Sequence, residues 1–143
     1  MPRFLVVDDD AASVKGMTWL LADDGHSVSP FTTGAEAVRA LARGLFDVVV
    51  TDLEMPLVDG REVVRAIREH QPNACVVVVT ERAPEHCVDL VKAGACLVVQ
   101  KPIDYEEVAK AIEACRGRNA NVSDCRCHMR WRAEEELVAL HRK

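Results

Sequence analysis

Aspartates stand where two short apolar runs of this sequence end. Asp8, Asp9 and Asp10 follow an apolar run at residues 4–7, and Asp52 follows a second run. A cluster of carboxylates repels itself unless a cation neutralises it, and carboxylate oxygens suit a hard divalent ion such as Mg²⁺. Asp10 stands next to a predicted helix start, where an acid is more often a cap, so we leave it out of the metal site.

A hydroxyl and an amine follow two further apolar runs. Thr80 ends one run, and Lys101 comes after another. A carboxylate such as Asp52 can act as a nucleophile and form an aspartyl phosphate. Thr80 and Lys101 would then hold the oxygens of the transferred group, with Mg²⁺ neutralising the developing charge. The residue types therefore favour phosphoryl transfer to Asp52.

The elements that position these side chains follow from the hydrophobic pattern. Short apolar runs without period-two alternation are typical of buried parallel strands, and each is followed by a helical pattern. Strands are predicted at residues 4–7, 27–31, 48–50, 75–79 and 96–99, and helices at about 14–21, 33–44, 60–71, 84–93 and 104–115. This alternation predicts a doubly wound α/β fold, whose ligands bind at the carboxyl ends of the strands.

Composition excludes several other classes of protein. The chain has 143 residues and a net charge of -5, with 49% hydrophobic residues, so one ordinary core is expected. We expect no membrane span, no signal peptide and a cytoplasmic location. Cys75, Cys87 and Cys96 are predicted to be reduced core residues. Nucleotide cofactors are disfavoured because the first strand ends in three acids and not in a glycine-rich loop.

Four short motifs together resemble the signature of response-regulator receiver domains. They are Phe4-Leu5-Val6-Val7-Asp8-Asp9, Thr51-Asp52-Leu53-Glu54-Met55-Pro56 with Asp59-Gly60, Val79-Thr80, and Lys101-Pro102. Each motif alone is weak, but their order at the ends of the right strands is specific. The resemblance covers about residues 3–115 and implies a flavodoxin-like (βα)5 sheet with strand order 2-1-3-4-5.

The resemblance also implies a chemistry for the site. Asp52 would accept a phosphoryl group from a sensor histidine kinase in a Mg²⁺-dependent reaction. Asp8, Asp9, Asp52 and the main-chain carbonyl of Glu54 would form the metal site. Thr80 and Lys101 would contact the phosphoryl oxygens, and the fourth helix, fifth strand and fifth helix would carry the signal to a downstream protein.

Some positions depart from the family pattern. Val98 stands where many receivers have a Tyr or Phe that changes rotamer, and Tyr105 is a weak substitute for it. Glu81 stands where a small residue is common, so we expect slower phosphotransfer. We also hypothesise that Glu54 and Arg82 form an ion pair that shields the phosphoryl group from water, although solvated side chains are the simpler alternative.

The tail from residue 116 is basic, with seven basic and four acidic side chains. Cys125, Cys127 and His128, with Cys115 or His141, are the ligand types of a zinc site, but their spacing is tighter than usual. Free thiols are favoured over zinc and over a redox pair. The last stretch predicts a short helix that docks on the receiver, on a second copy or on a partner. Direct nucleic-acid binding is disfavoured.

We therefore predict a receiver domain at residues 1–117 and a C-terminal linker with a short helix at residues 118–143. The expected function is a single-domain response regulator of a two-component phosphorelay, not a turnover enzyme, with a homodimer left open. Two alternatives are a phosphorylation-independent interaction module with the receiver fold, and a metal- or thiol-sensing tail on a receiver. Phosphate uptake separates the first two readings, and metal analysis tests the third.

Overall fold

The computed structural model describes residues 2–71, 74–83 and 86–116, with side chains described as far as residue 113. Within these ranges, five parallel strands form one sheet in the order β2-β1-β3-β4-β5. The strands are β1 (Arg3–Val7), β2 (Ser27–Phe31), β3 (Val48–Asp52), β4 (Cys75–Thr80) and β5 (Leu97–Gln100). The helices are α1 (Ala11–Asp23), α2 (Gly34–Arg43), α3 (Gly60–His70), α4 (Val88–Ala93) and α5 (Tyr105–Arg116). The predicted fold class and strand order are confirmed.

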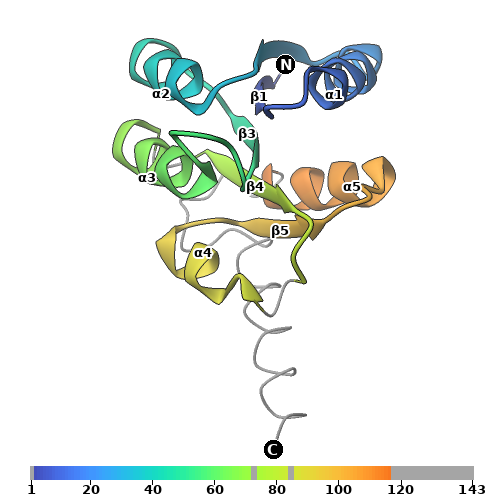
Figure 1. Ribbon diagram of the computed structural model, residues 1–143. Coiled ribbons are helices and arrows are strands. Elements are labelled where there is room, and N and C mark those ends of the chain that lie inside the picture. Colours follow the sequence, from blue (N-terminus) through green and yellow to red (C-terminus); the bar gives the residue numbers. More distant parts are fainter. Residues whose placement is uncertain (1, 72–73, 84–85, 117–143) are drawn as a thin grey trace, which may run out of the picture.

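Helices cover both faces of the sheet, which explains why its strands are continuously apolar (Figure 1). On one face α2, α3 and α4 pack over a core that includes Leu41, Ile67 and Leu90. On the other face α1 and α5 contribute Leu21 and Ile112 to a second core. Every residue of the central strands β3 and β4 is buried. The carboxyl ends of these strands are therefore fixed by packing on both sides.

Local signals set several helix boundaries as predicted. The hydroxyl of Thr33 caps α2 by accepting a hydrogen bond from the backbone N–H of Glu36 at 3.3 Å. Gly44 ends the same helix. Cys75, Cys87 and Cys96 are buried, and none of them forms a disulfide among the described residues, in agreement with the prediction of reduced core residues. No helix among the described residues has the length and apolar character needed to cross a membrane.

Other details differ from the sequence prediction. Not every apolar residue of the helix predicted at about 14–21 is buried: Trp19 is 67% exposed, because it lies on the outer side of α1, whose buried residues are Val14 and Leu21. The described part of α4 begins only at Val88, whereas the predicted helix began near residue 84. Cys125, Cys127, His128 and the helix predicted near the C-terminus lie outside the described residues.

Candidate metal centre at the carboxyl edge of the sheet

The sheet order brings the strand-end residues together as predicted. The backbones of β1 and β3 are neighbours, with Val7 opposite Thr51, so Asp8, just after β1, lies beside Asp52, the last residue of β3. Thr80 ends β4, the next strand, and Lys101 follows β5. Residues from four separate parts of the chain therefore converge on one edge.

Three carboxylates form a compact cluster at this edge. Each of Asp8, Asp9 and Asp52 offers a carboxylate oxygen, and these oxygens lie within 4.8 Å of one another. Asp8 and Asp52 are 8% and 6% exposed, whereas Asp9 is exposed. A backbone N–H from Asp10 donates to Asp8 Oδ1 at 2.9 Å and orients that side chain. Oxygen donors at this spacing fit a hard divalent cation such as Mg²⁺.

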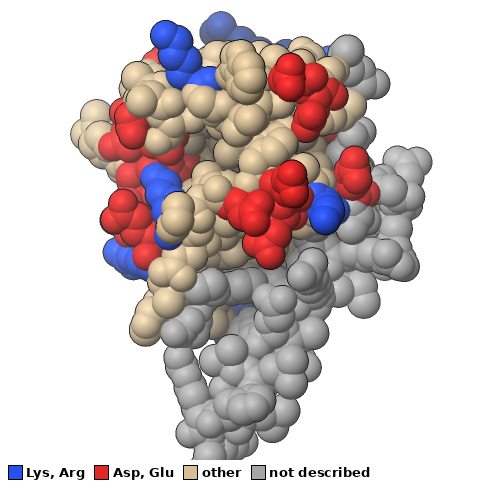
Figure 2. Space-filling model, turned by 90° about the vertical axis from the view of Figure 1, so that its right-hand side faces the viewer, with Lys and Arg blue, Asp and Glu red and all other residues tan. Residues whose placement is uncertain are grey.

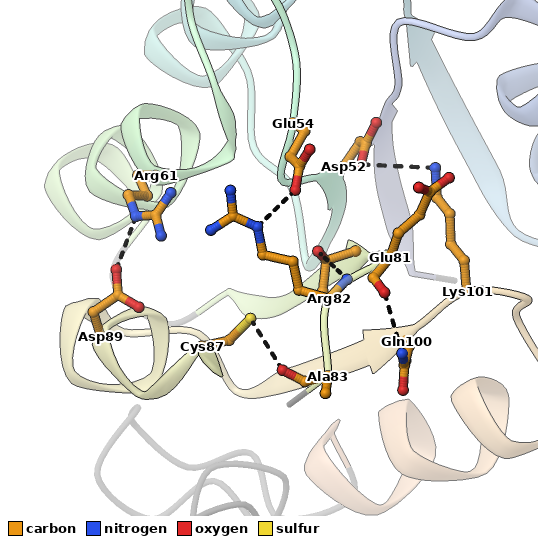
Figure 3. Close-up of polar contacts among 11 residues, drawn as sticks. Asp52, Glu54, Arg61, Glu81, Arg82, Ala83, Cys87, Asp89, Gln100 and Lys101 are labelled. Carbon is orange, nitrogen blue, oxygen red and sulfur yellow. Dashed lines mark hydrogen bonds and ion pairs between the residues drawn. The ribbon is translucent and has the colours of Figure 1, made fainter. Parts of the chain in front are cut away.

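Lys101 provides a positive charge beside the cluster (Figure 3). Its Nζ lies 3.5 Å from Asp8 Oδ2 and 3.7 Å from Asp52 Oδ1. Partial burial lowers the pKa of Lys101, but the charges of Asp52 and Asp8 outweigh burial and raise it overall. The amine is therefore held in its charged form, next to the carboxylate that the sequence predicts as the nucleophile.

The pKa of Asp52 is raised to about 6. Burial is the main cause and the negative charge of Asp8 the next, while Lys101 and a backbone hydrogen bond from Glu54 act in the opposite direction. One ammonium does not balance three carboxylates, so a divalent cation would favour the ionised, nucleophilic form of Asp52. The Glu54 carbonyl as a further ligand stays a prediction.

Thr80 connects the site to its neighbouring loops. It is 1% exposed, and its Oγ1 accepts a hydrogen bond from the backbone N–H of Arg82 at 3.1 Å. Its carbonyl accepts the backbone N–H of Lys101 at 2.8 Å. A change at the Thr80 hydroxyl would therefore act directly on the loop after β4.

The hypothesised pair of Glu54 and Arg82 is present in the structure. Arg82 Nε donates to Glu54 Oε1 at 2.8 Å, from the loop after β4 to the loop after β3 (Figure 3). Glu81, between Thr80 and Arg82, is exposed, and its carbonyl accepts a hydrogen bond from the Gln100 side chain at 3.1 Å. The site is thus flanked by charged side chains.

Sequence reasoning included Asp59-Gly60 in a receiver motif without assigning roles to the two residues, and the structure gives each of them one. Asp59 Oδ1 caps α3 by accepting the backbone N–H groups of Arg61 and Glu62 at 3.0 and 3.2 Å. A Cβ on Gly60 would lie 2.6 Å from the carbonyl oxygen of Asp52. The helix therefore starts in direct contact with the backbone of Asp52. The signal for the cap was the aspartate just before a helical pattern.

Three secondary expectations can be compared with the structure. Asp10 caps α1 through the Ala12 N–H at 3.1 Å, as predicted for an acid outside the metal site. Val98, which stands where many receivers have a Tyr or Phe, is buried in the core with residues of α3 and α4. A small apolar side chain therefore occupies this position. Tyr105 donates to Asp24 Oδ2 at 2.6 Å and is thereby bound to the C-cap of α1, which argues against a role as substitute for the aromatic.

Sequence reasoning missed an apolar cavity of about 300 Å³ beside the site. Asp52 and Lys101 line it together with Met17, Leu20 and Ile103. The signal for it was weak, because Met17 and Leu20 have the helical spacing of ordinary core residues. The cavity places apolar side chains next to the acidic cluster, between α1 and the loop after β5.

Comparison with known proteins agrees with this geometry. The family model described as response regulator receiver domain matches residues 4–113. The chain belongs to the response regulator receiver family. It is 31% identical over 131 residues to the transcriptional regulatory protein GlrR of Escherichia coli strain K12, covering 91% of this chain and 29% of GlrR.

Solved receiver structures share the fold. A response regulator receiver domain protein from Clostridium thermocellum matches with a TM-score of 0.77 and 26% identity, covering 83% of this chain and 97% of that one. The response regulator TrrA of Thermotoga maritima, solved in complex with Mg²⁺ and BeF, matches with a TM-score of 0.71 and 27% identity, covering 79% and 97%. This receiver spans 25% to 53% of the length of its curated relatives.

Proposed function

We propose that this receiver acts as a phosphorylation switch, with Asp52 as the phosphoacceptor. The observation that carries the proposal is the position of the Asp52 carboxylate, within 4.8 Å of the oxygens of Asp8 and Asp9 and 3.7 Å from Lys101 Nζ. A nucleophile needs a partner that stabilises the charge of the transferred group, and this site offers a lysine and a set of metal-binding oxygens.

The donor is a phosphohistidine of a sensor histidine kinase. A carboxylate oxygen of Asp52 attacks phosphorus, the P–N bond breaks, and the electron pair stays on the histidine nitrogen. Lys101 pairs with one phosphoryl oxygen and Thr80 donates its hydroxyl to another. Asp8, Asp9 and Asp52 would hold Mg²⁺, which when bound would neutralise the charge of the transferred group. The protein keeps the phosphoryl group and is therefore a signalling domain, not a turnover enzyme.

Thr80 is the proposed link from the phosphoryl group to the rest of the protein. If its hydroxyl turns toward a phosphoryl oxygen, it loses the hydrogen bond from the Arg82 N–H. That loss releases the loop between β4 and α4 and changes the surface of α4, β5 and α5. We propose that this surface binds a downstream protein in the cytoplasm. Because GlrR is named a transcriptional regulator, nucleic-acid binding by an attached output domain is a further outcome to test.

Phosphate uptake from acetyl phosphate in Mg²⁺ tests the proposal. A phosphate-affinity gel should show a retarded band for the wild type and none for Asp52→Asn or after addition of EDTA. Asp23→Asn is the matched control, because Asp23 is an exposed acid at the end of α1, outside the cluster. A band that persists in Asp52→Asn would place the phosphoryl group elsewhere.

The alternative of a phosphorylation-independent module rests on Val98 and Glu81. A buried valine cannot make the rotamer change of an aromatic residue, and Glu81 adds charge beside the acceptor. No uptake from acetyl phosphate or from histidine kinases would favour this alternative. The cysteines of the tail lie outside the described residues, so metal analysis of the purified protein tests the third reading.

A further inference from the structure

An apolar groove separates α1 from α5. Its larger cavity, of about 330 Å³, is lined by Phe4, Met17, Leu21, Val108, Ala109 and Ile112, among others. The 300 Å³ cavity beside Asp52 shares Met17, Val50 and Tyr105 with it. The groove therefore extends from the phosphoacceptor toward the C-terminal end of α5.

The groove also contains a buried polar atom without a partner. His26 lines the larger cavity, and its Nδ1 is buried without a hydrogen-bond partner among the residues that the structure describes. A buried ring nitrogen is normally hydrogen-bonded. The groove thus offers apolar surface together with an unused hydrogen-bonding group.

The rim of the groove is acidic. Asp24 and Glu113 line the cavity itself. Within α1, its C-cap and α5, the acidic residues are Asp23, Asp24, Glu106, Glu107 and Glu113, and the basic ones are Lys15, Lys110 and Arg116. Figure 2 views this side of the molecule and shows groups of acidic side chains beside a band of uncharged residues. A basic segment with apolar side chains would complement such a surface.

The chain itself contains such a segment. Residues 126–132 include Arg126, Arg130 and Arg132, interleaved with Met129 and Trp131, and no acid. α5 ends at Arg116, so the segment starts nine residues beyond a helix that lines the groove. Nine extended residues span about 30 Å, whereas a twelve-residue helix is only about 18 Å long. The tether can therefore reach any point of the groove.

We propose that residues 126–132 dock in the groove between α1 and α5 of the same chain, with Trp131 in the apolar cavity and the arginines on its acidic rim. A short tether gives the segment an effective concentration of about a millimolar, so weak contacts suffice. The docked segment lies beside the cavity that Asp52 lines.

Fluorescence of Trp131 in the full chain tests the proposal. Trp19→Phe leaves Trp131 as the single tryptophan, and Trp19 is 67% exposed, so the change costs little packing. In this background, acrylamide should quench the fluorescence of Trp131 less strongly in buffer than in urea. Glu113→Lys should lower the ratio of docked to free segment about threefold, as expected for one exposed ion pair. Glu107→Lys makes the same charge change on α5 but does not line the cavity and should leave quenching unchanged.

Three results would overturn the proposal. The first is quenching of Trp131 as strong in buffer as in urea. The second is protection that rises with protein concentration, which would assign the groove to a second copy of the chain. The third is protection that neither Glu113→Lys nor the tail variant Arg130→Glu with Arg132→Glu reduces. The tail variant changes only residues beyond α5, so it keeps the test valid even if a groove variant folds poorly.

Discussion

The side chains of Glu54 and Arg82 form an ion pair with 2.8 Å between Oε1 and Nε, near the proposed phosphoacceptor Asp52. The two side chains are 57% and 52% exposed, so the pair contributes little to folding stability. Its position matters more, because it joins the loop after Asp52 to the loop after Thr80. We hypothesise that water attacking a phosphoryl group on Asp52 approaches near this pair.

The first prediction is that Glu54→Ala and Arg82→Ala each shorten the lifetime of the aspartyl phosphate a few-fold. Removing either partner opens the mouth of the site to water. Decay of phosphorylated protein after removal of acetyl phosphate measures the effect. Arg61→Ala is the matched control, since it breaks an ion pair with Asp89 of the same 2.8 Å length between α3 and α4. Equal half-lives in all four proteins would eliminate the shielding role.

The second prediction is that Asp52→Asn stabilises the protein when Mg²⁺ is absent. The folded pKa of about 6 lies above the usual value of 3.8, so the folded state binds the proton more tightly. The contribution of Asp52 to the free energy of unfolding therefore falls as pH rises from about 4 to 6 and stays low above that range. We expect Asp52→Asn to gain about 1–3 kcal/mol at pH 7.5 and about half as much at pH 5.

Urea unfolding in EDTA at the two pH values measures this gain. Asp23→Asn is the control, and its stability should match the wild type at both values. Addition of Mg²⁺ should stabilise the wild type more than Asp52→Asn, because the variant lacks one carboxylate ligand. If the difference in stability between Asp52→Asn and the wild type were the same at pH 5 and at pH 7.5, burial would not be destabilising the Asp52 carboxylate.

The sequence predicted the site better than it predicted the supporting contacts. Asp8, Asp52, Thr80 and Lys101 could be identified because parallel strands place their carboxyl ends at one edge, a rule that needs only strand positions. The closeness of Gly60 to the Asp52 backbone could not be predicted, because it depends on how α3 packs against β3. The same holds for the groove between α1 and α5, since spacing predicted only which residues face inward.

The third prediction concerns two glycines in different surroundings. Gly60→Ala should destabilise the protein by about 2 kcal/mol and reduce phosphate uptake, because the added Cβ would lie 2.6 Å from the Asp52 carbonyl oxygen. Gly16→Ala, inside α1, meets nothing within 4 Å and should stabilise by about 0.5–1 kcal/mol. Urea unfolding and the phosphate-affinity gel give both measures. A Gly60→Ala protein with wild-type stability and uptake would contradict the close approach.

The fourth prediction concerns Leu57, in the loop that follows Asp52. Its φ is +68°, a left-handed conformation that costs a non-glycine residue about 1–2 kcal/mol, and its side chain is 99% exposed. Leu57→Gly removes this cost, loses almost no buried surface and adds the entropy of a glycine to the unfolded chain, so we expect a net gain of about 0.5–1 kcal/mol. Leu45→Gly is the control: Leu45 is 68% exposed but has no positive φ, so the glycine should only destabilise. Urea unfolding compares the two, and a loss of stability in both would show that the loop relaxes without strain at Leu57.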